Sequence, residues 1–165
     1  MSGDKSLADV CTVRLADWQR DGAALRDIRE TVFVREQNVP TELEWDELDV
    51  RCLHLIAFNR EGSPIGTARL LRNGTVGTVG RMAVLKEWRG RGVGRALVHR
   101  LLEEAEKWGI MQLVLHAQTH ATGFYERFGF RAEGDLFKEA GIPHVKMVLN
   151  RGQVHRTAET AETKD

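Results

Sequence analysis

The spacing of apolar residues is clearest between residues 80 and 109. Residues 82–85 are apolar at every position, which is typical of a strand buried on both faces. After a loop rich in glycine and arginine, apolar residues return at intervals of four from Val93 to Ala105, with charged residues on the opposite face. This spacing predicts an amphipathic helix over residues 92–108, ended by Gly109.

Shorter alternating or apolar runs predict the other strands. They are expected at residues 11–16, 54–59, 65–71, 75–85, 112–117 and 144–149, with a further extended segment from residue 130. A helix is expected from Asp17, as its cap, to about residue 37, with Gly22 as an interruption. A short helix is expected to begin at Thr119 or Thr122.

The order of these elements, β-α-β-β-β-α-β-α-β, predicts an α/β fold of the α+β type. We expect a mixed, mostly antiparallel central sheet of about six or seven strands, with helices on both faces. A single domain is expected over residues 10–149, between a flexible tail at 1–9 and a polar, disordered tail at 150–165. Ligands of such sheets bind at the carboxyl ends of strands, where neighbouring strands part.

The loop between strand 75–85 and helix 92–108 has the composition of an anion site. Its residues are Arg89, Gly90, Arg91, Gly92, Val93 and Gly94. The first amides of a helix have no partner within it, and the helix dipole adds positive charge there. Glycines let a phosphate approach the backbone closely. The loop lacks the Lys-Ser/Thr pair of a Walker A motif and the G-x-G-x-x-G spacing of a dinucleotide fold, and a plain glycine-rich surface turn is the alternative interpretation.

Composition excludes several classes of function. The 165 residues carry 24 basic and 24 acidic side chains, so no bulk attraction to nucleic acid is expected. No apolar run approaches the ~20 residues of a membrane helix, and the N-terminus has no apolar signal core. Cys11 and Cys52 lack metal-type spacing, and His116 and His120 fall on different elements, so no metal is expected. A cytoplasmic location with reduced thiols is the simplest expectation.

Residues 38–49 form an acidic segment without a clear period. Two interpretations stay open: a solvated loop or short helix, or an acidic lip that attracts a cationic acceptor. Its carboxylates are Glu42, Glu44, Asp46, Glu47 and Asp49.

Four stretches resemble the GNAT (general N-acetyltransferase) superfamily. Arg-x-x-Gly-x-Gly within RGRGVG (89–94) resembles its acetyl-CoA loop, and HAQTHATGFYERFGF (116–130) resembles the stretch that carries the superfamily's tyrosine. VFVREQNVP (32–40) and EAGIPHVKMVL (139–149) resemble an ElaA- and YjcF-like subgroup of predicted acyltransferases. The resemblance covers residues 11–149 and implies a GNAT-like fold.

The resemblance implies acetyl-CoA, or another short acyl-CoA, as donor and a small-molecule or peptide amine as acceptor. Tyr125 would act as the general acid, and an amide of residue 83 or 84 would stabilise the oxyanion. The base stays open among Glu36, Glu44, Glu47, His144 and water. Donor contacts would come from the strand backbone, from the loop, and from a histidine beside the pantetheine arm: Met82, Ala83, Val84, Arg89, Gly90, Arg91, Gly92, Val93, Gly94, Arg95 and His120.

The resulting hypothesis is an N-acyltransferase in which a primary amine attacks the thioester directly. Two alternatives stay open. A non-catalytic acyl-CoA-binding or sensing domain would keep the loop without needing Tyr125, and a phosphate binder of another class is disfavoured by the missing Walker lysine. Neither nucleic acid nor membrane is expected as a partner, and a homodimer is compatible with such folds.

Overall fold

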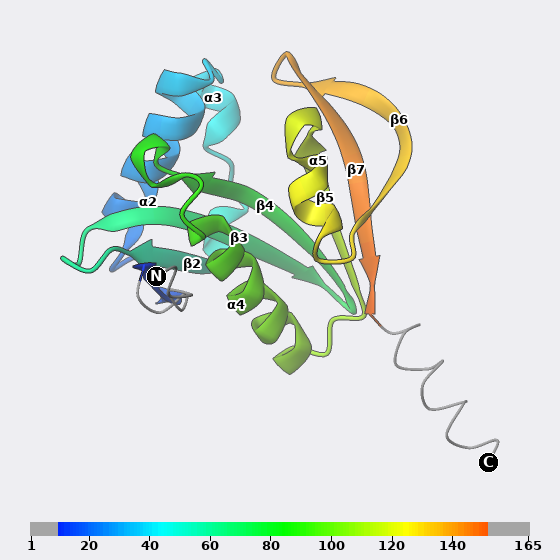
Figure 1. The fold of residues 1–165 in the computed structure, drawn as a ribbon, viewed down its shortest axis with the longest axis horizontal. Helices are drawn as coiled ribbons and strands as arrows, with labels where there is room; N and C mark the ends of the chain where they lie inside the picture. The colour runs from blue at the N-terminus through cyan, green and yellow to red at the C-terminus, as the bar shows by residue number, and fades with distance from the viewer. Residues whose placement is uncertain (1–9, 152–165) are drawn as a thin grey trace, which may run out of the picture. The chain divides into compact units, whose positions relative to one another are not determined.

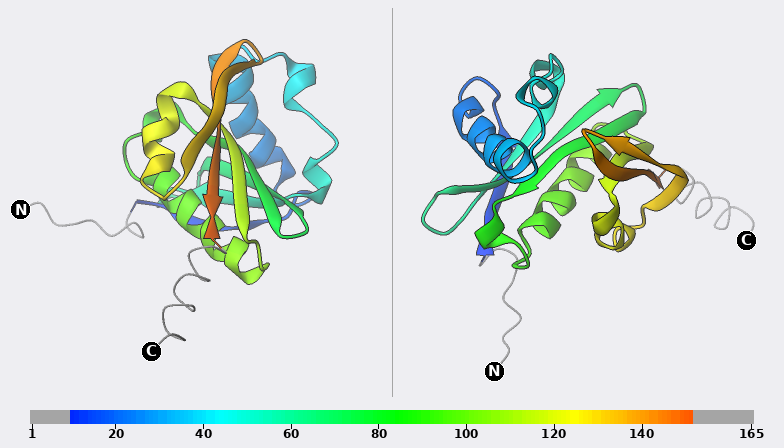
Figure 2. Two further views of the ribbon diagram at one scale, coloured as in Figure 1. Left: turned by 90° about the vertical axis from the view of Figure 1, so that its right-hand side faces the viewer. Right: turned by 90° about the horizontal axis from the view of Figure 1, so that it is seen from above.

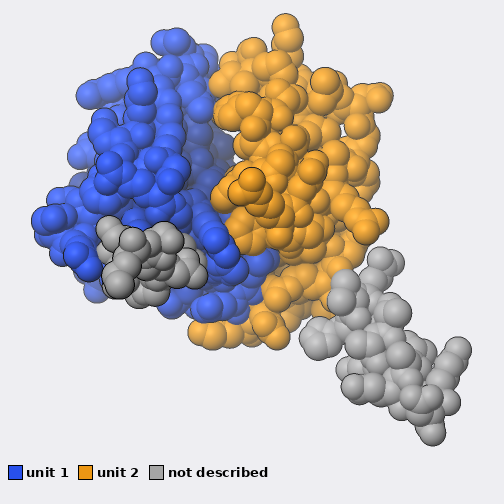
Figure 3. All heavy atoms as spheres, in the orientation of Figure 1, with its two compact units in different colours: residues 1–71, 80–104 blue, residues 72–79, 105–165 orange. Residues whose placement is uncertain are grey.

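The computed structural model describes residues 10–151, so the tail predicted at 1–9 and residues 152–165 of the tail predicted at 150–165 lie outside the described residues. Seven strands follow the order β1-β2-β3-β4-β5-β7-β6 in one sheet (Figure 1). The prediction of a mixed, mostly antiparallel sheet is confirmed. Contacts divide the chain into two compact units, residues 1–71 with 80–104 and residues 72–79 with 105–165 (Figure 3).

The first unit contains the antiparallel strands β1 (Thr12–Ala16), β2 (Leu53–Phe58) and most of β3 (Pro64–Asn73). It also holds the second half of β4 (Val76–Val84) and most of α4 (Val93–Lys107). Helix α2 (Gly22–Arg29) continues as the π-helix η1 (Glu30–Glu36). Figure 2 shows α2 and α4 on opposite faces of these strands. The short helices of this unit are α3 (Thr41–Glu44), η2 (Asp49–Arg51) and η3 (Lys86–Trp88).

The second unit begins with the start of β4, which pairs in parallel with β5 (Gln112–Gln118) over Val76–Val79. Strand β7 (Ile142–Asn150) pairs antiparallel with β5 on one side and with β6 (Arg131–Glu139) on the other. Between β5 and β6 the chain forms η4 (Thr119–Ala121) and α5 (Thr122–Glu126). Strand β7 begins two residues earlier than predicted. It also includes Asn150, which was predicted to be the first residue of the C-terminal tail.

The first helix differs from its prediction in two ways. It begins at Gly22 rather than at Asp17, so Gly22 does not interrupt it. Asp17 instead accepts hydrogen bonds from the amides of Gln19 and Arg20, both at 2.9 Å, in the turn before the helix. The apolar period correctly placed Leu25 in the core, but it could not show that the second half of the helix is a π-helix.

Candidate functional site

The glycine loop leads into the start of α4, where the first backbone amides lack helical acceptors. Gly90 and Gly92 have φ values of +74° and +91°, a left-handed conformation that favours glycine. The Gly92 carbonyl accepts the amide of Ala96 at 3.0 Å, which closes the first turn of α4. The amides before Ala96 have no acceptor within the helix, and no acidic residue lies in this first turn. The positive end of the helix is therefore left for an external anion.

The arginines of the loop are not equivalent. Arg89 is held by the protein: its Nε donates to the Val84 carbonyl at 3.0 Å, and its Nη2 donates to Glu36 Oε1 at 2.8 Å. Arg91 lies over the ring of Trp88, 4.9 Å from its centroid. The hydrogen bond from Arg89 lowers the pKa of Glu36, which makes this carboxylate a weak candidate for the base. The side chain of Arg89 thus ties the loop to the end of η1, while its backbone stays a candidate donor contact.

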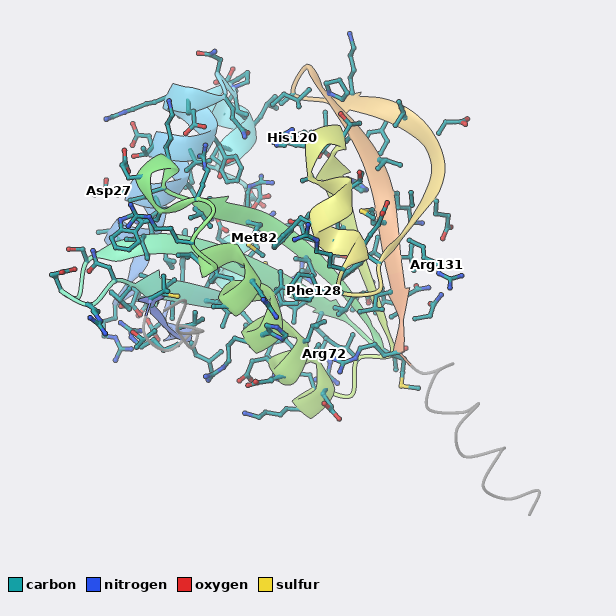
Figure 4. All side chains as sticks on the ribbon, in the orientation of Figure 1. Asp27, Arg72, Met82, His120, Phe128 and Arg131 are labelled. Carbon is teal, nitrogen blue, oxygen red and sulfur yellow. The ribbon has the colours of Figure 1, made fainter. Side chains whose placement is uncertain are left out.

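The end of β4 has an unusual backbone. Arg81 has a φ of +51°, which is strained for a residue other than glycine. After it, Met82 lies on β4 (Figure 4), and Ala83 packs against Ile28 and Val32. The amide of Leu85 donates to the Ile65 carbonyl of β3 at 2.9 Å. Because successive amides of a strand point in opposite directions, the amide of residue 84 faces away from β3.

A buried ion network underlies this part of β4. Arg29 has 1% of its surface exposed, and it donates to Glu44 Oε1 at 2.8 Å and to Asp49 Oδ1 at 2.7 Å. Its guanidinium also lies over the ring of Trp45, 4.9 Å from the centroid. Glu44 and Asp49 are each 3% exposed. Burial raises the pKa of Glu44 against the opposing effect of the Arg29 hydrogen bond.

Two further arginines complete the network. Arg69 donates to Asp49 Oδ1 at 2.9 Å and to both carboxylate oxygens of Asp46 at 2.8 Å. The hydrogen bonds from Arg69 to Asp46 lower the pKa of the Asp46 carboxyl group. Arg81 donates from Nη2 to the Glu44 carbonyl at 3.2 Å and to Asp46 Oδ2 at 3.3 Å. Its buried Nε lies 3.3 Å from a carboxylate oxygen of Glu44 without forming a hydrogen bond.

This network corrects the interpretation of residues 38–49. Glu44, Asp46 and Asp49 are neither a solvated loop nor a free acidic lip, because buried arginines neutralise them. Only Glu42 and Glu47 are exposed as expected. Two signals in the sequence could have indicated the pairing: an arginine at the inward position four residues after Leu25, and Arg69 inside an apolar strand.

The second unit holds the residues predicted after β5. Tyr125 on α5 is 8% exposed, and burial raises its pKa to about 12. Its ring meets those of Phe124 and Phe130 edge-on, at centroid distances of 5.0 and 5.9 Å. His120 lies exposed on η4 (Figure 4).

Two features are absent from the part of the chain that the structure describes. No group of three or more histidine, cysteine, aspartate or glutamate side chains in residues 10–151 could hold a metal ion. No helix in this range is long and apolar enough to cross a membrane.

The family is shown by comparison with known proteins. Residues 16–151 match the acetyltransferase (GNAT) domain, and the chain therefore belongs to the GNAT acetyltransferases. The uncharacterized N-acetyltransferase YjcF of Bacillus subtilis is 39% identical over 122 residues, which cover 73% of this chain and 86% of YjcF.

Two crystal structures are similar over almost their whole length. Escherichia coli ElaA matches with a TM-score of 0.75 and 28% identity, covering 84% of this chain and 98% of ElaA. An acyl-CoA N-acyltransferase from Pseudomonas aeruginosa matches with a TM-score of 0.74 and 33% identity, covering 84% and 97%. The predicted superfamily, its ElaA- and YjcF-like members and the class of acetyl-CoA-dependent N-acetyltransferase are confirmed.

The ion network generates a prediction about stability. Asp49→Asn removes the charge that two buried guanidinium groups share, so it should lower the free energy of unfolding by about 3 kcal/mol or more. Glu47→Gln, an exposed site on the same segment, should change it by less than about 0.5 kcal/mol. Urea unfolding of both variants measures the difference. Equal stability of the two variants would show that the network does not hold the fold.

Proposed function

We propose that this protein transfers an acetyl or short acyl group from acyl-CoA to a primary amine by direct attack of the amine on the thioester. The observation that carries this proposal is the start of α4. Glycines with positive φ, no acidic residue in the first turn and amides without helical partners are together suited to a pyrophosphate. Membership of the GNAT acetyltransferases supplies the class of donor.

The donor would be bound mainly by backbone. Of the amides of residues 89–95 predicted to hold the pyrophosphate, that of Arg89 already donates to the Lys86 carbonyl at 3.3 Å, so those of residues 90–95 would bind it, with Arg91 and Arg95 adding charge. The backbone of residues 82–84 would pair with the amides of the pantetheine arm. His120 is proposed to lie beside that arm. Since Arg89 is engaged with Glu36, its side chain would fix the loop rather than contact phosphate.

The oxyanion that forms at the thioester carbonyl needs a donor already in place. Of the two amides considered, that of Val84 is favoured over that of Ala83. Because successive amides of β4 point in opposite directions, the Ala83 amide points toward β3, whereas the Val84 amide faces away from it. The leaving thiolate then needs a proton, and the buried phenol of Tyr125 keeps its own at neutral pH because its pKa is raised.

The donor site is tested at Gly92. A side chain at a φ of +91° strains the loop, so Gly92→Ala should weaken acetyl-CoA binding by about 1–3 kcal/mol through misplaced amides. Gly62→Ala is the matched control, because Gly62 has a φ of +83° with nothing near its added Cβ. Calorimetry on both folded variants measures the effect. Unchanged affinity in Gly92→Ala would place the donor elsewhere.

The acid is tested at Tyr125. Tyr125→Phe keeps the ring and removes the proton, so kcat should fall by about 10²–10⁴-fold while the Kd for acetyl-CoA stays within a few fold. Single-turnover rates and melting temperatures are measured on one preparation. A rate within twofold of wild type would remove Tyr125 from the mechanism. Binding of acetyl-CoA by wild type, without turnover on any amine, would instead favour the non-catalytic domain.

A further inference from the structure

One face of the second unit gathers side chains that the donor site does not use. Strands β5, β6 and β7 lie side by side there, and His116, Phe137, Glu139 and His144 meet on them. The Phe137 ring stacks on His144, with centroids 6.0 Å apart, and meets His116 edge-on at 4.9 Å. The group therefore combines two imidazoles, a carboxylate and an apolar wall.

The hydrogen bonds fix the protonated nitrogen of each histidine. His144 Nδ1 lies 2.7 Å from the Ile142 carbonyl, and His116 Nδ1 lies 3.2 Å from Glu139 Oε1. Carbonyl and carboxylate oxygens only accept, so both Nδ1 atoms must donate. The neutral His144 ring consequently carries its lone pair on Nε2.

The second oxygen of Glu139 faces this lone pair. Oε2 lies 3.7 Å from His144 Nε2, with no hydrogen between them when the ring is neutral. Two acceptors that face each other can be bridged by a donor with two hydrogens, and a primary amino group is such a donor. The side chain of His144 is 9% exposed and that of Glu139 is 53% exposed, so the carboxylate is the more accessible of the two groups.

The carboxylates predicted as bases fit this role less well. Glu36 is paired with Arg89, and Glu44 is buried against Arg29. Glu47 is exposed to solvent. Among the four, His144 is the one with a ring oriented by a hydrogen bond from its Nδ1, which leaves Nε2 facing a carboxylate oxygen of Glu139.

We propose that Glu139 Oε2 and His144 Nε2 together bind the amino group of the acceptor, and that His144 is the base of the reaction. This inference rests on the proposed function. Glu139 holds the amino group, and Phe137 contacts the carbon chain next to it. The acceptor class is thus a primary amine on an apolar chain, such as an alkylamine or a lysine side chain.

The protons of the proposed reaction pass through His144 and the acid. A neutral amine attacks the thioester carbon, a C–N bond forms, and the nitrogen becomes positively charged and acidic. His144 Nε2 takes one proton from it. The C–S bond then breaks, and the CoA thiolate takes a proton from the acid. His144 finally passes its proton to solvent, and the acid regains one from solvent, so the neutral amine reacts with no net release of a proton. Because the ammonium ion first loses one proton to solvent to become that neutral amine, one ammonium ion and one thioester give one amide, one thiol and one proton.

Other charged groups face this site. Lys146 follows His144 on the same face of β7 and pairs with Glu133 of β6 at 3.8 Å. His120 belongs to η4, which packs against β7. Glu133 lies on the same strand as Glu139 without contacting His144, so it supplies a matched control.

Binding is tested without acyl transfer. Propylamine is titrated into the full chain while NMR follows the Cε1–H signals of its histidines. Saturable shifts should appear at His144 and His116, Glu139→Gln should weaken the affinity by about 10-fold or more, and Glu133→Gln should leave it unchanged. Equal affinity in Glu139→Gln and wild type would overturn the proposal, whatever the fate of the proposed function.

Catalysis is tested with acetyl-CoA and the best primary amine from an acceptor screen. His144→Ala should lower kcat by about 10²–10⁴-fold, leave the KM for acetyl-CoA within twofold and regain activity when imidazole is added. Rescue by imidazole would not follow from a merely structural role. A rate within twofold of wild type, or a folded variant with lost activity and no rescue, would overturn His144 as the base.

Discussion

Asp49 accepts from two arginines in a buried position, and the first unit depends on that contact. Removing charges from water costs several kcal/mol for each ion, so such groups persist only when their hydrogen bonds are satisfied. Asp49 joins Arg29 of α2 to Arg69 of β3, while Asp46 joins Arg69 to Arg81. The network thereby connects a helix, the acidic segment and two strands, and it ends at the residue whose strained backbone precedes the proposed donor-binding part of β4.

The two ends of the proposed reaction use different kinds of chemistry. The donor would be bound by backbone amides, which a glycine loop and a strand end can present whatever their side chains. The acceptor would be bound by the side chains of Glu139 and His144, and the Ile142 carbonyl orients the His144 imidazole. The proposed donor contacts therefore follow from a recognisable motif, whereas the proposed acceptor contacts depend on how β6 and β7 bring individual side chains together.

Local periodicity was enough to predict most of the fold. The strands, helix 92–108 and the glycine loop follow from spacing within a few residues, and they were located to within about two residues of the structure. Features that depend on distant partners were not predictable. The acidic segment left two interpretations open, because the positions of Arg29 and Arg69 indicate burial of these arginines but not which carboxylates they face. Likewise, His144 was one candidate base among several, because only the pairing of β6 with β7 brings Glu139 close to it.

Hydrogen exchange tests most directly whether backbone amides hold the acyl donor. Amide exchange is measured by mass spectrometry with and without saturating acetyl-CoA. We predict slower exchange in the segments 82–84 and 89–95, because the amides of Met82, Val84 and residues 90–95 would be bonded to pantetheine and pyrophosphate, and little change in β1 or β2. Tight binding of acetyl-CoA with unchanged exchange in both of these segments would contradict it.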